Sequence, residues 1–366
     1  MSAFVREQLL RWAAAVPVLA IVVLVFTWGR SLPGFVIAVV VVLLAGAVLA
    51  AVHHAEVVAH RVGELFGSLI LAVAVTIIEV GMIIALTIGG GAKTQTLARD
   101  TVFAAVMVTC NGIVGLALLI GALRRHVTAF NAEGAGAALA TVVTLATLSL
   151  VVPTFTTTHP GPQFTPAQLA FASVVSLAMY GLFVLVQTRR HRDYFLPVAT
   201  EDDIVNVDEE SEPPPIGAAL VSLVLLVVAL IAVVGDAKIV SPAIEAGVEA
   251  AELPQSVVGV VIALLVLLPE TLAAARAAQR DRVQISLNLA LGSAMASIGL
   301  TIPAISVASI WIHQPLVLGL GGTQMVLLAL TGIVGVLTVL PGRATLMQAG
   351  IHLLVFAAYL FLAASP

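Results

Sequence analysis

Long apolar stretches, interrupted by charged residues, glycine and proline, run through most of this chain. Stretches such as VPVLAIVVLVF and LVSLVLLVVALIAVV are continuous, so they lack the alternation of apolar and polar positions that a membrane β-strand shows. About 20 apolar residues span a bilayer as a helix, and the pattern predicts eleven such helices. Their expected bounds are residues 9–28, 33–59, 65–89, 101–123, 134–155, 165–187, 216–235, 255–278, 284–312, 321–340 and 344–363.

Composition agrees with an all-α polytopic membrane protein. Of 366 residues, 60% are hydrophobic and 10% are charged, whereas soluble domains have about 45–50% apolar and about 25% charged residues. A single cysteine, Cys110, excludes an internal disulfide or a cysteine metal cluster. The net charge of −4 gives no basic surface for nucleic acid. The first apolar stretch is followed by GRSLPG rather than a small-residue cleavage site, so a retained helix is expected there.

The basic residues predict an orientation, because cytoplasmic loops are enriched in lysine and arginine. With a cytoplasmic N-terminus and an external C-terminus, 12 of the 16 basic residues fall on the inside. The inside residues are Arg6, Arg11, Arg61, Arg124, Arg125, Arg189, Arg190, Arg192, Arg276, Arg280, Arg282 and Arg343, and the outside ones are Arg30, Lys93, Arg99 and Lys238.

A long polar segment near the middle of the chain divides the expected spans. We expect a leading helix (residues 1–30), a five-helix repeat (31–188), an acidic cytoplasmic linker (189–215) and a second five-helix repeat (216–366). The linker is expected either to be a solvated disordered segment or to gather or sense cations. Because five is odd, the two repeats enter the membrane from opposite sides, an inverted topology typical of secondary transporters.

Two acidic residues stand in the middle of apolar runs, Glu79 in LILAVAVTIIEVGMIIAL and Glu270 in VVIALLVLLPETLAAA. Each belongs to the second expected helix of its repeat. An ionised acid at a helix centre costs about 3 kcal/mol on the lenient insertion scale, so such a position usually marks a function. Two carboxylates suit a hard cation such as Ca²⁺, and the same pair binds protons when no metal is present. The pattern therefore predicts competition between a cation and protons for Glu79 and Glu270, which is the requirement for antiport.

Further oxygen donors lie near the two glutamates in the sequence. The span after Glu270 carries Ser286, Ser293, Ser297 and Thr301 at helical spacing, which suits either ion binding or helix packing. Other candidate supporting residues are Thr76, Thr109 and Asn111. Pro269 is expected to break or kink its helix and free carbonyl oxygens as ligands.

Glu56 and His60 lie at the expected cytoplasmic end of the second span, where they are either solvated at the interface or part of a proton relay. The chain contains no HExxH, GxSxG or P-loop motif, so neither a membrane hydrolase nor an ATP-driven pump is indicated, and no enzyme activity or bound cofactor is expected.

The segments HAEVVAHRVGELFGSLILAVAVTIIEVGMIIAL, RDTVFAAVMVTCNGIVGLALLIG and LPETLAAARAAQRDRVQISLNLALGSAMASIGLTIP resemble the two α-repeats of the calcium:cation antiporter superfamily. The chain is most similar to the bacterial calcium/proton antiporters of the ChaA-type group in its CAX branch. ISLNLALGSA is the most specific part, being similar to the family's ISLGVALGSA. The GNxxE motif reads VTIIE and VLLPE here, without its glycine and asparagine, and Ala296 stands where many relatives have glutamine.

The resemblance implies Ca²⁺ export in exchange for protons, with Na⁺ or K⁺ as further substrates. It matches Glu79 and Glu270 to the central cation-binding acids and Ser293 to the serine of the second repeat's GS pair. The expected location is the inner membrane of a bacterium, and the expected partners are inorganic cations, protons and the lipid bilayer. The sequence does not predict an oligomeric state. A Na⁺/H⁺ or K⁺/H⁺ antiporter using the same acids is the nearest alternative, followed by a passive cation channel and a membrane scaffold.

Overall fold

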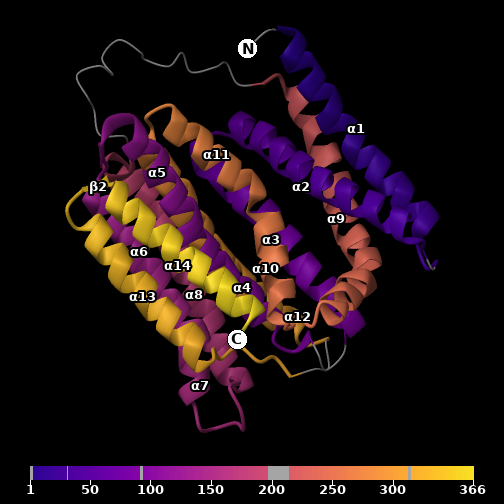
Figure 1. Cartoon of the computed structure of the whole chain (residues 1–366). Helices are drawn as coiled ribbons and strands as arrows, with labels where there is room; N and C mark the ends of the chain where they lie inside the picture. The colour runs from indigo at the N-terminus through magenta and orange to yellow at the C-terminus, as the bar shows by residue number, and fades with distance from the viewer. Residues whose placement is uncertain (1–2, 31, 91–93, 197–213, 312–314) are drawn as a thin grey trace. The chain divides into compact units, whose positions relative to one another are not determined.

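The computed structural model describes residues 3–30, 32–90, 94–196, 214–311 and 315–366, and these are mostly helical (Figure 1). The α-helices are α1 (Ala3–Thr27), α2 (Gly34–Val62), α3 (Glu64–Gly90), α4 (Leu97–Met107), α5 (Val114–Arg125), α6 (Ala132–Ala146), α7 (Val152–Phe155), α8 (Pro166–Leu185), α9 (Ile216–Ala250), α10 (Ser256–Val266), α11 (Leu268–Gln279), α12 (Val283–Ala308), α13 (Gly322–Val339) and α14 (Leu346–Ala364). Shorter turns are the π-helical η2 (Val108–Ile113), η3 (Thr147–Val151) and η4 (Val186–Arg190), and the 3₁₀-helical η5 (Arg192–Phe195). Most of the expected linker lies outside the described residues.

Nine helical segments in the described part of the chain are long and apolar enough to cross a membrane, and α10 with α11 makes a tenth if the bent pair is one span. Each of the eleven expected spans overlaps one of the helices, which confirms the polytopic α-helical class. The total of eleven spans and the orientation stay predictions. The expected end of a span at residue 235 is wrong, because α9 continues through Asp236 to Ala250.

The helices pack into two compact units. The first contains residues 1–94 and 212–258, and in it α9 contacts α1, α2 and α3. The second contains residues 95–211 and 259–366, and in it α12 packs against α4, α5, α6, α8 and α11. In this second unit α13 and α14, yellow in Figure 1, lie side by side. These two units are defined by contacts between helices and do not coincide with the two predicted sequence repeats. The boundaries of the repeats stay a prediction.

A glycine allows close packing of α3 against α9 in the first unit. A Cβ atom on Gly81 would lie 2.4 Å from Val234 Cγ2, which is closer than real Cβ atoms approach. The absence of a side chain at Gly81 therefore lets α9 lie directly on α3, in the small-residue packing common between membrane helices.

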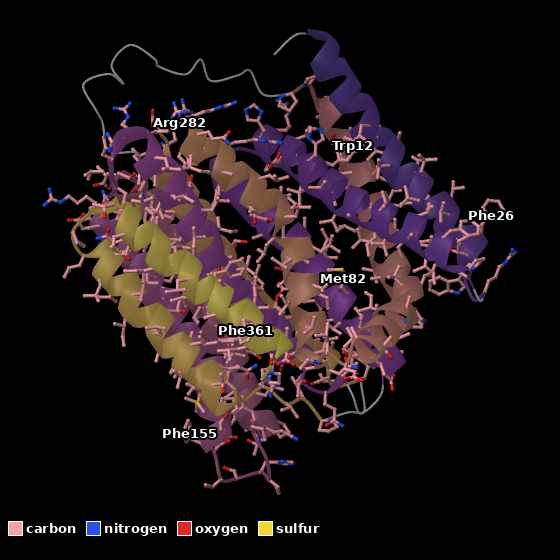
Figure 2. The ribbon with its side chains drawn as sticks, in the orientation of Figure 1. Trp12, Phe26, Met82, Phe155, Arg282 and Phe361 are labelled. Carbon is pink, nitrogen blue, oxygen red and sulfur yellow. The ribbon has the colours of Figure 1, made fainter. Side chains whose placement is uncertain are left out.

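Basic residues gather at one end of the second unit. Arg124 Nε lies 3.5 Å from Asp281 Oδ1, and Arg125 Nη2 lies 3.3 Å from Asp281 Oδ2. Nearby, β1 (Val127–Ala129) pairs antiparallel with β2 (Arg343–Thr345). Figure 2 shows Arg282 at one end of this unit and Phe155 at the other. The sequence predicts that all these arginines lie on the cytoplasmic side of the membrane.

Two polar side chains, Gln284 and Asn288, hold the N-terminal part of α12 in place. Gln284 Oε1 accepts a 2.6 Å hydrogen bond from the backbone N–H of Asn131, and Gln284 Nε2 donates to Asn288 Oδ1 at 2.9 Å. Asn288 Nδ2 in turn donates to the carbonyl oxygen of Phe195 at 2.6 Å. Asn288 is one of the two positions, with Leu289, at which ISLNLALGSA differs from the family's ISLGVALGSA, and the Asn288 side chain attaches α12 to η5.

Candidate ion-binding residues

Glu79 lies in α3 of the first unit with only 3% of its surface exposed. Thr76 precedes it by almost one turn, is also buried, and donates its hydroxyl hydrogen to the carbonyl oxygen of Ala72 at 2.8 Å. Because that hydrogen points along the helix, the lone pairs of the Thr76 oxygen are directed outward and can accept a cation or a proton donor.

Glu270 lies in the first turn of α11, in the second unit, and is 8% exposed. The helix axis bends by 52° between α10 and α11, at Leu267. Pro269 follows this break and has no N–H to donate to the carbonyl of Leu265. The predicted kink at Pro269 is therefore present, and it gives Glu270 the N-terminal position of a helix, where a negative charge is favoured.

The hydroxyl groups of α12 have different environments. Ser286 donates to the carbonyl oxygen of Ala274 at 2.7 Å and so attaches α12 to α11, which is the packing role considered for this series. Ser293 is half-buried and Ser297 is buried. A Cβ on Gly292 would meet no atom within 4 Å. Of these two serines, Ser293 is therefore the more exposed.

Thr109 and Asn111 lie in η2, a π-helical turn between α4 and α5. Both are fully buried, and Thr109 donates to the carbonyl oxygen of Ala105 at 2.7 Å. η2 packs against α11 and α12, so Glu270, Ser293, Ser297, Thr109 and Asn111 come from neighbouring elements of the second unit. π-helical turns occur frequently at functional sites.

Asn111 also belongs to a buried hydrogen-bond network with α13 and α14. Its Nδ2 donates to Thr331 Oγ1 at 2.9 Å, and Thr331 donates to the carbonyl oxygen of Leu327. His352 Nδ1 lies 3.3 Å from Asn111 Oδ1, and Nε2 lies 3.0 Å from Thr338 Oγ1. Since the amide oxygen only accepts, neutral His352 donates through Nδ1 and accepts the Thr338 hydroxyl at Nε2. The network therefore holds the amide of Asn111 in one orientation.

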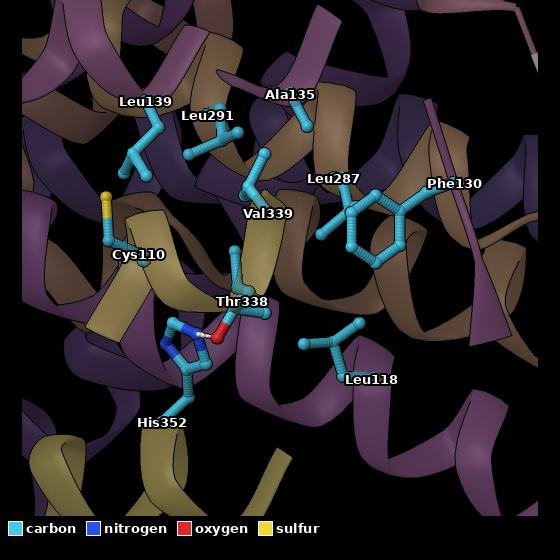
Figure 3. Close-up of a pocket in the computed structure, with 12 residues that line it drawn as sticks. Cys110, Leu118, Phe130, Ala135, Leu139, Leu287, Leu291, Thr338, Val339 and His352 are labelled. Carbon is cyan, nitrogen blue, oxygen red and sulfur yellow. Dashed lines mark hydrogen bonds between the residues drawn. The ribbon is translucent and has the colours of Figure 1, made fainter. Parts of the chain in front are cut away.

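A small cavity lies beside this network in the second unit (Figure 3). Its volume is about 20 Å³, which is room for about one water molecule. Thr338 and His352 supply polar atoms to its wall, and Leu118, Phe130 and other apolar side chains form most of the rest. The size and apolar lining exclude a hydrated cation from this cavity.

We expect His352→Ala to lower the free energy of unfolding by roughly 2–4 kcal/mol, because it leaves Asn111 Oδ1 and Thr338 Oγ1 without a partner and enlarges the cavity. Thermal unfolding of the purified protein in detergent measures the change. Phe361→Ala, on the same helix at a residue that is 68% exposed, serves as the control. Equal unfolding temperatures for the two variants would contradict a stabilising role for the network.

Glu56 and His60 are exposed on the last two turns of α2. By contrast, the neighbouring His54 is buried, and its Nε2 lies 3.0 Å from the carbonyl oxygen of Ala13. Both the interfacial role and the proton-relay role considered for Glu56 and His60 require exposed side chains, which these two residues have.

Within the described residues, no group of three or more His, Cys, Asp and Glu side chains is arranged to hold a metal ion. A cation bound by Glu79 or Glu270 would therefore take its remaining ligands from hydroxyl, amide or carbonyl oxygens or from water. Hard cations such as Ca²⁺ and Na⁺ accept such oxygen ligands.

Asp236 and His352 are buried polar residues that the expected site does not include. The sequence predicts Asp236 just outside a span, because a charge ends the apolar run there, yet its side chain is completely buried in α9. His352 shows no ligand spacing in the sequence, although GIHLLVF places it inside an apolar run. An ionisable residue inside an apolar run is the signal that identified Glu79, and the same signal could have identified His352.

Comparison with known proteins relates the whole chain to ion exchangers. A family model described as sodium/calcium exchanger protein matches residues 32–189 and 221–364. A putative ionic transporter, y4hA from Sinorhizobium fredii, is 44% identical over 97% of this chain and 96% of its own length. The sodium-potassium/proton antiporter ChaA from Escherichia coli is 36% identical over 94% of this chain and 93% of its own length.

Solved structures support the same fold. The structure of YfkE matches with a TM-score of 0.70 and 16% identity, covering 97% of this chain and 99% of that one. An H⁺/Ca²⁺ exchanger, CAX, matches with a TM-score of 0.68 and 16% identity over 97% and 88% of the two chains. The family is one of transporters and not of catalytic enzymes. This multi-pass membrane protein therefore belongs to the sodium/calcium exchanger family of cation exchangers.

Proposed function

We propose that this chain exchanges a cation for protons across the inner membrane of a bacterium, and that Glu79 and Glu270 bind both kinds of ion. The observation that carries the proposal is the burial of one glutamate of each unit, Glu79 in α3 and Glu270 in α11, within a segment apolar enough to span a membrane. An ionisable group inside a membrane span is a functional residue by default, because an inert position would be apolar.

Antiport follows from competition at these carboxylates. A carboxylate that holds a cation has no proton, and one that holds a proton has lost the charge that attracts the cation. Alternating exposure of the occupied groups to the two sides of the membrane then couples the two flows. Thr76, Thr109, Asn111, Ser293 and Ser297 are proposed as supporting oxygen donors, and Pro269 as the residue that positions Glu270.

Ca²⁺ is our first candidate for the transported cation. Ca²⁺ takes six to eight oxygen ligands in flexible geometry. Two carboxylates provide up to four oxygens, and hydroxyl groups of Thr76 and Ser293, carbonyls near the α10–α11 break and water provide others. Two negative charges also match the charge of a divalent ion.

Na⁺ or K⁺ is the second candidate, and the 36% identical relative favours it, since that protein is named a sodium-potassium/proton antiporter. The absence of the motif asparagine before both Glu79 and Glu270 also removes two amide oxygens from a Ca²⁺ site. Monovalent ions tolerate fewer and weaker ligands, so these differences suit them better.

A cation-addition experiment in everted membrane vesicles distinguishes the candidates. Respiration acidifies the vesicle lumen, and an antiporter dissipates that pH gradient when its cation is added outside. We expect micromolar Ca²⁺ to dissipate the gradient in vesicles that contain this chain but not in vesicles that lack it. A response to Na⁺ or K⁺ with none to Ca²⁺ would overturn the Ca²⁺ assignment and retain antiport, while no response to any of the three would overturn the proposed function.

Two further parts of the proposal concern the cytoplasmic side. Glu56 and His60 are proposed to pass protons between water and the membrane interior, since both are exposed near the end of α2. The acidic linker is proposed to lie in the cytoplasm, because its first two residues, Arg189 and Arg190, are expected there.

A further inference from the structure

Asp236 is a further acidic side chain buried inside a membrane-spanning helix, besides Glu79, Glu270 and Asp100. None of its surface is exposed, and neither carboxyl oxygen has a hydrogen-bond partner among the described residues. Buried polar atoms in proteins are nearly always hydrogen-bonded, so an exception requires an explanation.

The packing of α3 on α9 places Asp236 and Glu79 within about 6 Å of each other along the helix axes. Gly81 and Val234 are in direct contact. Glu79 is two residues from Gly81, and Asp236 is two residues from Val234, a rise of about 3 Å in each helix. Along α9, the step of two residues from Val234 to Asp236 turns the side-chain direction by about 200° around the helix axis. Because Val234 faces α3, Asp236 points away from α3. The carboxyl group therefore lies on another face of α9 within the first unit.

Few charged groups surround Asp236. The described side chains of α1, Trp12–Thr27, include no ionisable group, and Leu24 of that helix contacts Gly235. On α2 the ionisable residues begin at His53, and His54 contacts Ala13, about 16 Å along α1 from Leu24. On α3 the only ionisable residue with a described side chain is Glu79. On α9 itself, Lys238 Nζ lies 5.1 Å from the ring centre of Trp28.

These surroundings determine the charge of Asp236 in this conformation. An ionised carboxylate buried without a hydrogen bond or a counter-ion is strongly unfavourable, so these surroundings favour the neutral, protonated form of Asp236. Even a neutral carboxyl is less stable in this position than an apolar side chain of similar size. Packing alone therefore gives no reason for an aspartate here.

We infer that Asp236 is a proton-carrying residue of the exchanger, in addition to Glu79 and Glu270; this inference rests on the proposed antiport. In the conformation described, Asp236 holds a proton. When water reaches it at another stage of the cycle, its O–H bond breaks, the electron pair stays on the carboxylate and the proton passes to water. Reprotonation from the opposite side completes the transfer, and no other reactant is needed.

Carbodiimide labelling of the unmodified protein tests the protonation of Asp236. The apolar reagent dicyclohexylcarbodiimide reacts with protonated carboxyl groups, and mass spectrometry locates the modified residue. We expect modification of Asp236 at neutral pH and none of Glu249, which is exposed on the same helix. A protein modified elsewhere but not at Asp236 would overturn the inference, independently of any transport activity.

Asp236→Asn tests the transport of the proton, because asparagine has the same shape and cannot release one. In proteoliposomes we expect this variant to move fewer protons per cation than the unmodified protein. Ser222→Ala, a buried polar position on the same helix, is the control and should leave the ratio unchanged. An unchanged ratio in Asp236→Asn would overturn the inference. If Asp236→Asn does not fold, the labelling experiment alone tests the inference. If the unmodified protein itself shows no cation/proton exchange, the proposed function is refuted instead.

Discussion

Glu270→Gln is expected to reduce cation/proton exchange to the level of protein-free vesicles, whichever cation is supplied. Glutamine keeps the size of the side chain but has neither the negative charge that attracts a cation nor the proton that is exchanged for it. Glu270 is 8% exposed at the start of α11, so bulk water does not replace the missing charge. Exchange is measured as the simultaneous movement of protons and cations in proteoliposomes containing purified protein.

Glu249→Gln is the matched control, because it makes the same substitution at an exposed glutamate of α9. This control should exchange ions at the rate of the unmodified protein. Glu79→Gln should lose exchange as completely as Glu270→Gln. Retention of exchange in Glu270→Gln would show that this glutamate does not bind the transported ions, and retention only in Glu79→Gln would leave Glu270 as the single essential acid.

Gly259→Ala is expected to destabilise the second unit by about 1–3 kcal/mol, the range typical of overpacked sites. A Cβ on Gly259 would lie 2.8 Å from the backbone carbonyl carbon of Asp100 and 2.9 Å from the backbone nitrogen of Thr101. Backbone atoms cannot rotate away as a side chain can, so α10 must move from α4. Because α10 leads into the break before Glu270, we also expect slower exchange.

Thermal unfolding in detergent, followed by exchange in proteoliposomes, measures both effects. Gly247→Ala is the control, since a Cβ there would meet no atom within 4 Å and alanine is the better helix former. This control should unfold at the same temperature as the unmodified protein or slightly above it. A Gly259→Ala protein as stable as Gly247→Ala would show that α10 and α4 are less closely packed than described.

Local patterns in the sequence predicted much of what surrounds Glu270. The apolar runs predicted the helices, because a backbone in a bilayer must satisfy its own hydrogen bonds. Pro269 predicted the break between α10 and α11, since the missing N–H is a property of that residue alone. The spacing of Ser286, Ser293 and Ser297 placed these hydroxyls on one face of α12, but it could not show that Ser286 bonds to the carbonyl of Ala274.

Features that depend on packing between distant segments could not be predicted in this way. A charge usually ends a membrane span, and this rule placed Asp236 outside one, but α1, α2 and α3 surround α9 and bury the residue. The network from Asn111 to His352 joins residues 241 positions apart in the sequence. Neither the burial of Asp236 nor the Asn111–His352 network is marked by a local sequence pattern. The grouping of helices into two units depends on contacts of the same long-range kind.

Reconstitution of the purified protein into sealed vesicles tests antiport most directly. Vesicles are loaded with the cation, diluted into cation-free buffer of the same pH, and the membrane potential is held at zero. We predict that the outward cation flow drives protons inward and generates a pH gradient, and that Glu270→Gln generates none. Cation efflux without any pH gradient would contradict the account and would identify a passive channel instead.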